Sequence, residues 1–268
     1  MSASTLSRPA PMLPITLPDC TAFQMVFVEG GDFLRGDIHG DIDEAARPPH
    51  PVRVDSFYIG QYPVTQALWR AVALSPEGKR RKMEPEPFRF KGSEQLPAEN
   101  ISWNDITQQF LPALNALTGQ DFSLPTEAQW EYAARGGRHH RDGYRYAGSD
   151  KLKELAWFDG NSGKKTHEVG QKYPNQLGLY DMSGNVWEWC ADAYDSDFYK
   201  ACAERADKAG RPIDNPFCER GSRRVLRGGS CWDEPQDCTV AFRIIFDPAN
   251  RNYDLGFRLL LQLGATKA

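Results

Sequence analysis

Residues whose oxygens could bind a metal ion lie close together between residues 181 and 188, where the sequence reads DMSGNVWE. A loop here can turn the carboxylates of Asp181 and Glu188 toward one point, while the carbonyls of Gly184 and Val186 fill the space between them. Calcium takes about six to eight oxygens of this mixed kind. The segment therefore predicts a structural calcium site with these four ligands. The alternative is that its polar side chains only satisfy buried backbone groups.

A second unusual group lies near the C-terminus, where residues 242–246 read FRIIF. One interpretation is a central strand that is packed on both faces, since such strands are apolar throughout. The other is that only Arg243 is buried, while the apolar side chains are displayed beside acidic residues. Apolar patches with polar rims are typical of protein-binding sites, and we favour this second interpretation. The residues assigned to the site are Cys231, Trp232, Asp233, Glu234, Phe242, Ile244, Ile245, Phe246, Tyr253 and Asp254.

Two alternatives remain open within this segment. Trp232 is either a core residue of the scaffold or the centre of the displayed patch. Cys231 and Cys238 belong to a set of six cysteines that includes no C-x-x-C pair and no Cys/His cluster at zinc spacing. We expect free thiols, because the chain has no export signal that would favour disulfides. The sequence also lacks a nucleophile elbow and a phosphate-binding loop.

The overall composition excludes several functional classes. The chain has 268 residues and a formal net charge of -4, which gives no reason to expect nucleic acid as a partner. No apolar run is long enough to span a bilayer, so we expect no membrane insertion. The first residues lack the basic start and continuous apolar core of a secretory signal. We therefore expect a cytoplasmic protein.

Three helices and a hairpin are predicted to position these candidate sites. Helical spacing of apolar residues predicts helices over 63–72, 102–117 and 126–135. The last of these begins with a T-E-A-Q capping-box pattern at Thr126. Alternation around a Gly-Gly pair predicts a hairpin over 23–36.

The remaining segments are assigned from composition. Residues 1–22 contain several prolines and predict a flexible lead-in. The rest, residues 23–268, reads as one domain, because no convincing linker interrupts it. The charged stretch 192–224 predicts a surface loop of unknown role. After residue 136 glycine, asparagine and aromatic residues dominate, which indicates extensive loops with aromatic side chains between them.

Three long motifs resemble the formylglycine-generating-enzyme family, also called the sulfatase-modifying factors. They are LPTEAQWEYAARGG at 124–137, GLYDMSGNVWEW at 178–189, and RVLRGGS with NYDLGFRLLL in the tail from about 224 to 261. The resemblance implies an α+β, C-type-lectin-like fold, with small twisted antiparallel sheets, two main helices and long loops. It also implies a calcium at the positions already named in 181–188.

The same resemblance allows the oxidase activity of the family to be judged. The oxidases hold copper between cysteines at the third and eighth positions after the serine of the Gly-Gly-Ser motif. Here these positions are Asp233 and Cys238. A carboxylate cannot replace a soft thiolate on Cu(I), so we expect no copper and no catalysis. A related sulfoxide-synthase activity is also disfavoured, because its histidine set needs an additional helical domain.

Other members of this fold are variable proteins, the targets of diversity-generating retroelements, in which a C-terminal stretch is rewritten around fixed scaffold residues. The segment 224–261 resembles such a region in its position and in its alternation of scaffold and unrelated residues. Most of its unusual residues are reachable from an asparagine codon by changing adenines. We therefore expect a non-catalytic protein that binds an unknown protein or surface ligand. The alternatives are an oxidase of the formylglycine-generating type or an inactive homologue of it.

Overall fold

The computed structural model describes residues 10–42 and 44–263, and in these ranges three small sheets carry the architecture. The five-stranded sheet has the order β1-β2-β5-β12-β6, the four-stranded sheet β10-β9-β7-β11, and the three-stranded sheet β3-β4-β8. The strands are β1 (Met12–Thr16), β2 (Ala22–Val28), β3 (Gly31–Arg35), β4 (His50–Val54), β5 (Phe57–Gly60), β6 (Phe122–Ser123), β7 (Trp187–Ala193), β8 (Ile213–Asp214), β9 (Arg224–Arg227), β10 (Arg243–Phe246), β11 (Leu255–Phe257) and β12 (Leu260–Gln262).

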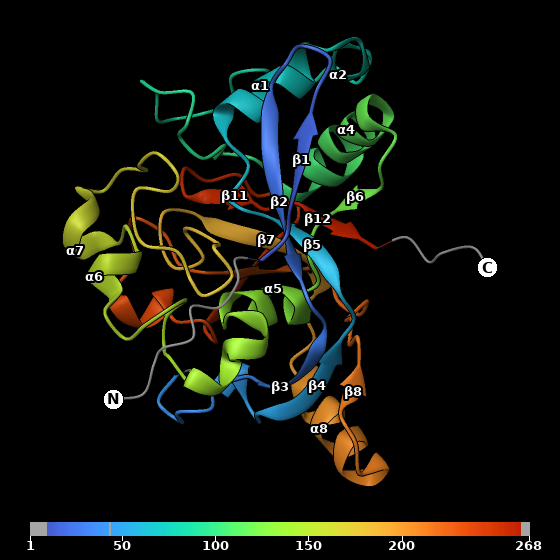
Figure 1. Cartoon of the computed structure of the whole chain (residues 1–268), viewed down its shortest axis with the longest axis vertical. Helices are drawn as coiled ribbons and strands as arrows, with labels where there is room; N and C mark the ends of the chain where they lie inside the picture. Colours follow the sequence, from blue (N-terminus) through green and yellow to red (C-terminus); the bar gives the residue numbers. More distant parts are fainter. Residues whose placement is uncertain (1–9, 43, 264–268) are drawn as a thin grey trace.

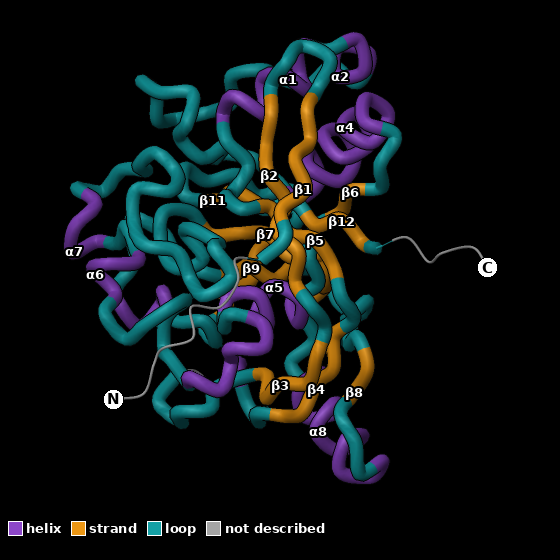
Figure 2. The backbone as a smooth tube through the Cα atoms, in the orientation of Figure 1, coloured by secondary structure: helices purple, strands orange, loops and turns teal. Residues whose placement is uncertain are grey.

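The sheets are mixed and not purely antiparallel. Most neighbouring strands run antiparallel, but β11 is parallel to β7 and β8 is parallel to β4. Loops account for much of the remaining chain, as Figure 2 shows on the side that carries α6 and α7. The expected α+β fold with small sheets and extensive loops is therefore confirmed.

The helices begin where the sequence places capping residues. The α-helices are α1 (Gln66–Leu74), α2 (Pro76–Arg80), α3 (Trp103–Asp105), α4 (Leu111–Thr118), α5 (Glu127–Ala134), α6 (Leu152–Leu155), α7 (Asp159–Ser162) and α8 (Phe198–Ala209). Short 3-10 turns lie at Glu44–Ala46, Gly137–Asp142 and Pro235–Cys238, and a π-helical turn at Ile106–Phe110 joins α3 to α4.

Side-chain caps account for the starts of three predicted helices. Thr65 accepts a hydrogen bond from Leu68 N at the start of α1. Ser102 and Asp105 form a capping box on α3, and Thr126 and Gln129 form one on α5. Each cap satisfies backbone N–H groups that have no partner within the helix. The predicted helices are confirmed, including the capping box at Thr126.

Three expectations about segments are wrong. Residues 23–36 do not form a hairpin, because β2 pairs with β1 and β5 while β3 pairs with β4 in another sheet. The lead-in over 1–22 is interrupted by β1, whose five residues pair with β2; residues 1–9 lie outside the described ranges. The stretch 192–224 is not a simple loop, since it contains α8 and β8 and buries Cys202 and Cys218.

The core is packed between these sheets and helices. One part lies around Trp69, Phe110 and Phe257, where the Trp69 and Phe110 rings stack with centroids 5.1 Å apart. Another lies around α5 and the middle of β2, β5 and β9. In Figure 1 the β1–β2 pair, α1 and α2 lie at one end of the molecule, and α8 with β8 lies at the opposite end. No helix in the described ranges has the length and apolar character needed to cross a membrane.

Candidate ligand-binding surface

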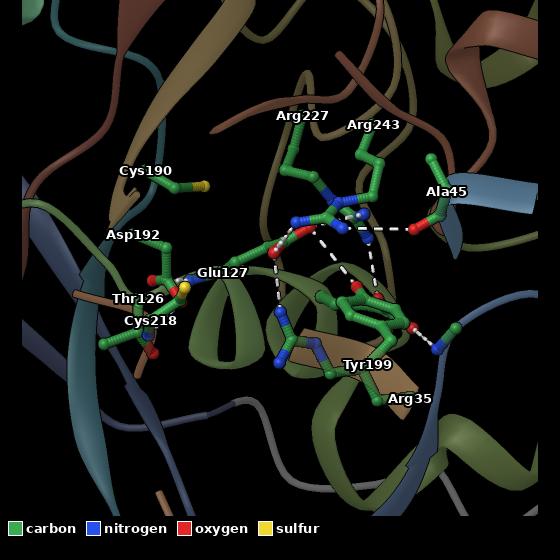
Figure 3. A network of polar contacts seen from close by, with 12 residues as sticks. Arg35, Ala45, Thr126, Glu127, Cys190, Asp192, Tyr199, Cys218, Arg227 and Arg243 are labelled. Atoms are coloured by element: carbon green, nitrogen blue, oxygen red, sulfur yellow. Dashed lines mark hydrogen bonds and ion pairs between the residues drawn. The ribbon is translucent and has the colours of Figure 1, made fainter. Parts of the chain in front are cut away.

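A buried network of ions joins the C-terminal segment to α5. Glu127 Oε2 accepts hydrogen bonds from Arg35 Nη2 at 2.6 Å and from Arg243 Nη2 at 2.7 Å, and Glu127 Oε1 accepts one from Arg227 Nη1 at 3.1 Å. Figure 3 shows these guanidinium groups gathered around Glu127, with the Tyr199 hydroxyl beside them. Burial by itself raises the pKa of Glu127, but the guanidinium groups of Arg243, Arg35 and Arg227 outweigh it and lower the pKa to about 2.

The two arginines of the C-terminal segment also fix its backbone. Arg227 donates to the carbonyls of Ala241 at 2.9 Å and Val240 at 2.6 Å, and its Nη2 also pairs with Glu131 at 2.7 Å. Arg243 donates to the carbonyl of Ala45 at 3.1 Å. The prediction that Arg243 is a buried structural residue is confirmed, since its exposed fraction is 5%. The backbone around Arg243 is therefore tied to α5 through Glu127.

Strand β10 lies at the edge of its sheet. Within the described residues it pairs only with β9, in a register that sets Arg243 opposite Arg227 and Ile245 opposite Val225. An edge strand leaves one side of the sheet free. The central-strand interpretation of residues 242–246 is therefore wrong.

The apolar residues of this strand are half-buried, and they divide between two faces. Phe242, Ile244 and Phe246 pack against the core that contains Trp187 and Leu226. Ile245 points to the other face of the sheet, against the core around α5. Side chains alternate along a strand, so Ile245 cannot share a contact face with Ile244. The prediction of one continuous apolar patch is thus only partly met: each side chain is partly exposed, but they do not form a single face.

Two aromatic residues of the candidate surface are exposed. Trp232 has an exposed fraction of 45% and Tyr253 one of 44%, which places Trp232 on the surface and not in the core. The ammonium of Lys164 lies 5.9 Å from the Trp232 ring centre, and the guanidinium of Arg89 lies 5.2 Å from that of Tyr253. Both distances fall within the range of cation–π attraction.

The polar members of the predicted site lie around Ser230. The Ser230 hydroxyl is hydrogen-bonded to Asp233, and it lies 3.3 Å from Asp254 Oδ2. Asp233 and Asp254 are half-buried, and Glu234 is exposed. Cys231 is the exception, because it is fully buried, and its prediction as a ligand-contacting residue is wrong. Its backbone instead ties loops together, since Cys231 N donates to Asn185 O at 3.0 Å and Ser162 Oγ donates to Cys231 O at 2.5 Å.

Glu99 is a neighbour of this site that the sequence did not predict. It is fully buried, its Oε1 accepts a hydrogen bond from Phe90 N at 2.8 Å, and its Oε2 has no hydrogen-bond partner among the described residues. Burial, together with the charge of Asp254, raises the pKa of Glu99 to about 7. Burial and the charge of Asp233 raise the pKa of Asp254 to about 6. In the sequence, the only indication of a special role is that the acidic Glu99 stands close to apolar residues, between Ala98 and Ile101. It lies more than 100 residues before the C-terminal segment.

The residues predicted to bind calcium do not fit that ion as they are arranged. Both carboxylate oxygens of Glu188 are engaged, by the Arg258 guanidinium at 2.7–3.2 Å and by Trp130 Nε1 at 2.7 Å. Asp181 accepts a hydrogen bond from Gly170 N at 2.8 Å, and burial raises its pKa to about 6. In the described part of the chain, no three His, Cys, Asp or Glu side chains gather at metal-binding distance. An arginine thus supplies the positive charge that calcium was expected to supply to Glu188.

The copper positions of the oxidases also differ in their chemistry. Asp233 stands at the first of them and is hydrogen-bonded to Ser230. Cys238, at the second, is fully buried, and burial raises the pKa of its thiol well above the ordinary value. Burial likewise raises the pKa of Cys231. Thiols of this kind are protonated and poorly suited to bind a metal or to attack a substrate.

Comparison with known proteins agrees with this architecture. The sequence model of the sulfatase-modifying factor enzyme 1-like domain matches residues 13–263. The structure of Treponema denticola variable protein 1 is similar, with a TM-score of 0.78 and 30% identity over 94% of this chain and 99% of that one. The formylglycine-generating enzyme of Streptomyces coelicolor is 30% identical over 305 residues, which covers 91% of each protein.

Other relatives are much longer. The chain is 31% identical to the serine/threonine-protein kinase pkn1 of Chlamydia pneumoniae over 88% of its own length, but it spans only 37% of that protein. With its small mixed sheets and long loops, the chain has a fold of the formylglycine-generating-enzyme type. The chain belongs to the family of sulfatase-modifying factor enzyme 1-like domains. The names of these relatives include both enzymes and a variable protein, so family membership alone does not assign an activity.

Proposed function

We propose that this chain is a non-catalytic binding protein, the target of a diversity-generating retroelement, whose C-terminal surface varies on a fixed scaffold. The proposal rests on a difference in burial within the C-terminal segment. The Arg243 guanidinium is buried against Glu127, whereas Trp232 and Tyr253 in the same segment are nearly half exposed. The similarity to Treponema denticola variable protein 1 over 94% of the chain supports this function.

The physical advantage of such an arrangement is preorganisation. A binding surface whose backbone is already fixed loses little entropy when it meets a partner. Exposed aromatic residues such as Trp232 and Tyr253 are suited to act as anchors, because residues of this type dominate binding energies. The partner would be a protein or another surface ligand that contacts the residues around Ser230 and the free edge of β10.

A pair of display libraries tests this proposal. The first randomises the exposed positions Trp232 and Tyr253 together with the partly exposed positions Asp233, Ile244 and Phe246. The second, matched in size, randomises Leu226, Arg227, Val240, Arg243 and Phe257, which are all buried. We expect most clones of the first library to resist protease and to yield specific binders against a panel of unrelated proteins. Equal degradation of the two libraries, or a folded first library without binders, would contradict the proposal.

The second candidate is a formylglycine-generating oxidase, which is favoured by the similarity to the Streptomyces coelicolor enzyme over 91% of both proteins. Asp233 argues against it, since an oxygen ligand is a poor partner for Cu(I). Anaerobic Cu(I) titration, followed by turnover of a Cys-x-Pro-x-Arg peptide with mass-spectrometric detection, distinguishes the two. Turnover of the peptide would show that the protein is an oxidase and would overturn the proposed binding function.

A further inference from the structure

Three carboxylates meet beside the exposed aromatic residues, and in the described part of the chain none of them forms an ion pair. They are Asp233, Asp254 and Glu99. Three other buried acids of this protein are neutralised directly: Glu127, Glu188 and Asp105 each pair with at least one arginine within 2.7 Å. Desolvated carboxylates without such a contact are unfavourable. The charge of Arg89 acts on Glu99 and opposes the rise of its pKa, but in the described ranges the cluster has no direct ion pair of the kind that these three acids have.

The positions of the three groups follow from backbone contacts between distant segments. Asn100 N donates to Asn252 O at 3.0 Å, which sets the loop of Glu99 beside the loop of Asp254. Trp187 N donates to Asp254 O at 2.7 Å and so fixes Asp254 at the start of β11. Ser230 then joins Asp254 to Asp233 through its hydroxyl.

Glu99 is independent evidence for a missing ligand. It comes from a segment outside the C-terminal region, its side chain is fully buried, and its Oε2 has no hydrogen-bond partner among the described residues. Asp254 Oδ1 is likewise buried without a partner in those ranges. Each of these oxygens can accept a hydrogen bond, and desolvated carboxylates interact most strongly with charged donors.

The aromatic residues around the cluster determine which kind of cation is expected. Trp232 follows Ser230 by two residues, and Tyr253 precedes Asp254. Both rings already have a cation of the chain near their faces, Lys164 for Trp232 and Arg89 for Tyr253. Rings of this kind attract organic cations, and guanidinium is planar and more weakly hydrated than an ammonium group.

We propose that Asp233 and Asp254, with Trp232 and Tyr253 beside them and Glu99 beneath, form a receptor for a guanidinium or ammonium group presented by the binding partner. This inference rests on the proposed binding function and names the chemistry that the partner must carry. Asp233 and Asp254 accept hydrogen bonds from the cation. Glu99 is a positioning residue, because its buried charge strengthens the site through Asp254.

Titration with a small cation tests the receptor without knowledge of the partner. The probe is N-acetyl-arginine amide, and the readout is the Trp232 indole N–H signal in a proton–nitrogen correlation spectrum, assigned with the variant Trp232→Phe. We expect a saturable shift of this signal. The uncharged analogue, N-acetyl-citrulline amide, should cause none, since it retains the shape but not the charge.

Variants separate the roles of the three acids. Asp254→Asn and Glu99→Gln should each weaken the binding of N-acetyl-arginine amide by about fivefold or more, since charge-assisted hydrogen bonds are stronger than neutral ones. Glu219→Gln, which removes an exposed charge outside the cluster, should leave binding unchanged. Arg89→Gln should tighten binding, because it removes the cation that now lies at the Tyr253 ring. Glu99→Gln removes a buried charge that forms no ion pair and keeps an oxygen that can accept the hydrogen bond from Phe90 N, so it should remain folded, which a melting curve checks.

The outcomes distinguish this receptor from the proposed function. An equal response to arginine and citrulline amides, or a response to calcium alone, would overturn the receptor. If the surface library yields binders while arginine amide causes no shift, the binding function stands and the receptor fails. If arginine amide binds but the surface library does not fold, the receptor stands and the variable scaffold fails.

Discussion

Arg243 Nη2 lies 2.7 Å from Glu127 Oε2, and this contact joins residues that are 116 positions apart in the chain. It ties the edge strand β10 to the first turn of α5. Arg227 of the neighbouring strand β9 reaches the same carboxylate at 3.1 Å. The backbone of the segment that carries the candidate binding residues is therefore fixed by buried side chains that are not part of the binding surface.

Removal of the Arg243 guanidinium should destabilise the protein strongly. We expect Arg243→Met to lower the free energy of unfolding by about 3 kcal/mol, because buried Glu127 loses one of its three guanidinium partners and only Arg35 and Arg227 remain. Denaturant unfolding measures the loss. Arg53→Met, which breaks an exposed pair with Asp32, serves as the control and should change stability little. Similar losses in the two variants would show that the network does not hold the strand.

Truncation of the exposed aromatic residues should cost little. Tyr253→Ala and Trp232→Ala should each lower the free energy of unfolding by less than about 1 kcal/mol, since both rings are nearly half exposed. Phe257→Ala should cost about 3–5 kcal/mol, because Phe257 is fully buried against Phe110. Thermal melts of the three variants provide the comparison. A large loss in Tyr253→Ala would place that ring in the core.

Glu99 should make stability depend on pH. Its folded pKa of about 7 lies above the ordinary value of 4.5, so its contribution to stability is complete below that ordinary value and is lost as pH rises through about 7. The variant Glu99→Gln cannot ionise. The free energy of unfolding of Glu99→Gln, compared with that of the wild type, should therefore increase by about 2 kcal/mol between about pH 5 and about pH 8. A difference that is constant across this range would mean that Glu99 titrates normally.

Calcium should not stabilise this protein through the residues 181–188. Glu188 is already paired with Arg258, so a chelator should leave the melting temperature unchanged, and added calcium should release no heat in calorimetry. Glu188→Gln should lower stability equally with and without calcium, because it breaks the pair with Arg258. A rise of the melting temperature by several degrees on addition of calcium would show that the ion binds in this loop after all.

The sequence predicted the local elements well where the physical signal is local. The helices after Thr65, Ser102 and Thr126 begin at their caps, because a cap is a contact between residues three positions apart. The assignment of β2 and β3 to separate sheets could not be predicted in this way. Strand partners are chosen by contacts between distant residues, and the Gly-Gly pair between the two strands looked like a hairpin turn.

The candidate site was predicted in part for the same reason. Trp232, Tyr253 and Arg243 were placed in a shared segment, and the structure exposes the first two and buries the third. Cys231 was misplaced because exposure along an irregular loop follows no period. Glu99 was missed because its relation to Asp254 arises from a backbone contact between Asn100 and Asn252. Arg258 was not recognised as the partner of Glu188, which is 70 positions away.

The proposed function requires a fixed backbone that carries exchangeable side chains. The decisive measurement is a crystal structure of a variant in which five residues are all replaced by others: Trp232, Asp233, Ile244, Phe246 and Tyr253. We predict that the backbone over 224–261 superposes on the present structure within about 1 Å, with the Arg243–Glu127 contact intact. A rearranged β10, or a protein that no longer folds, would contradict it.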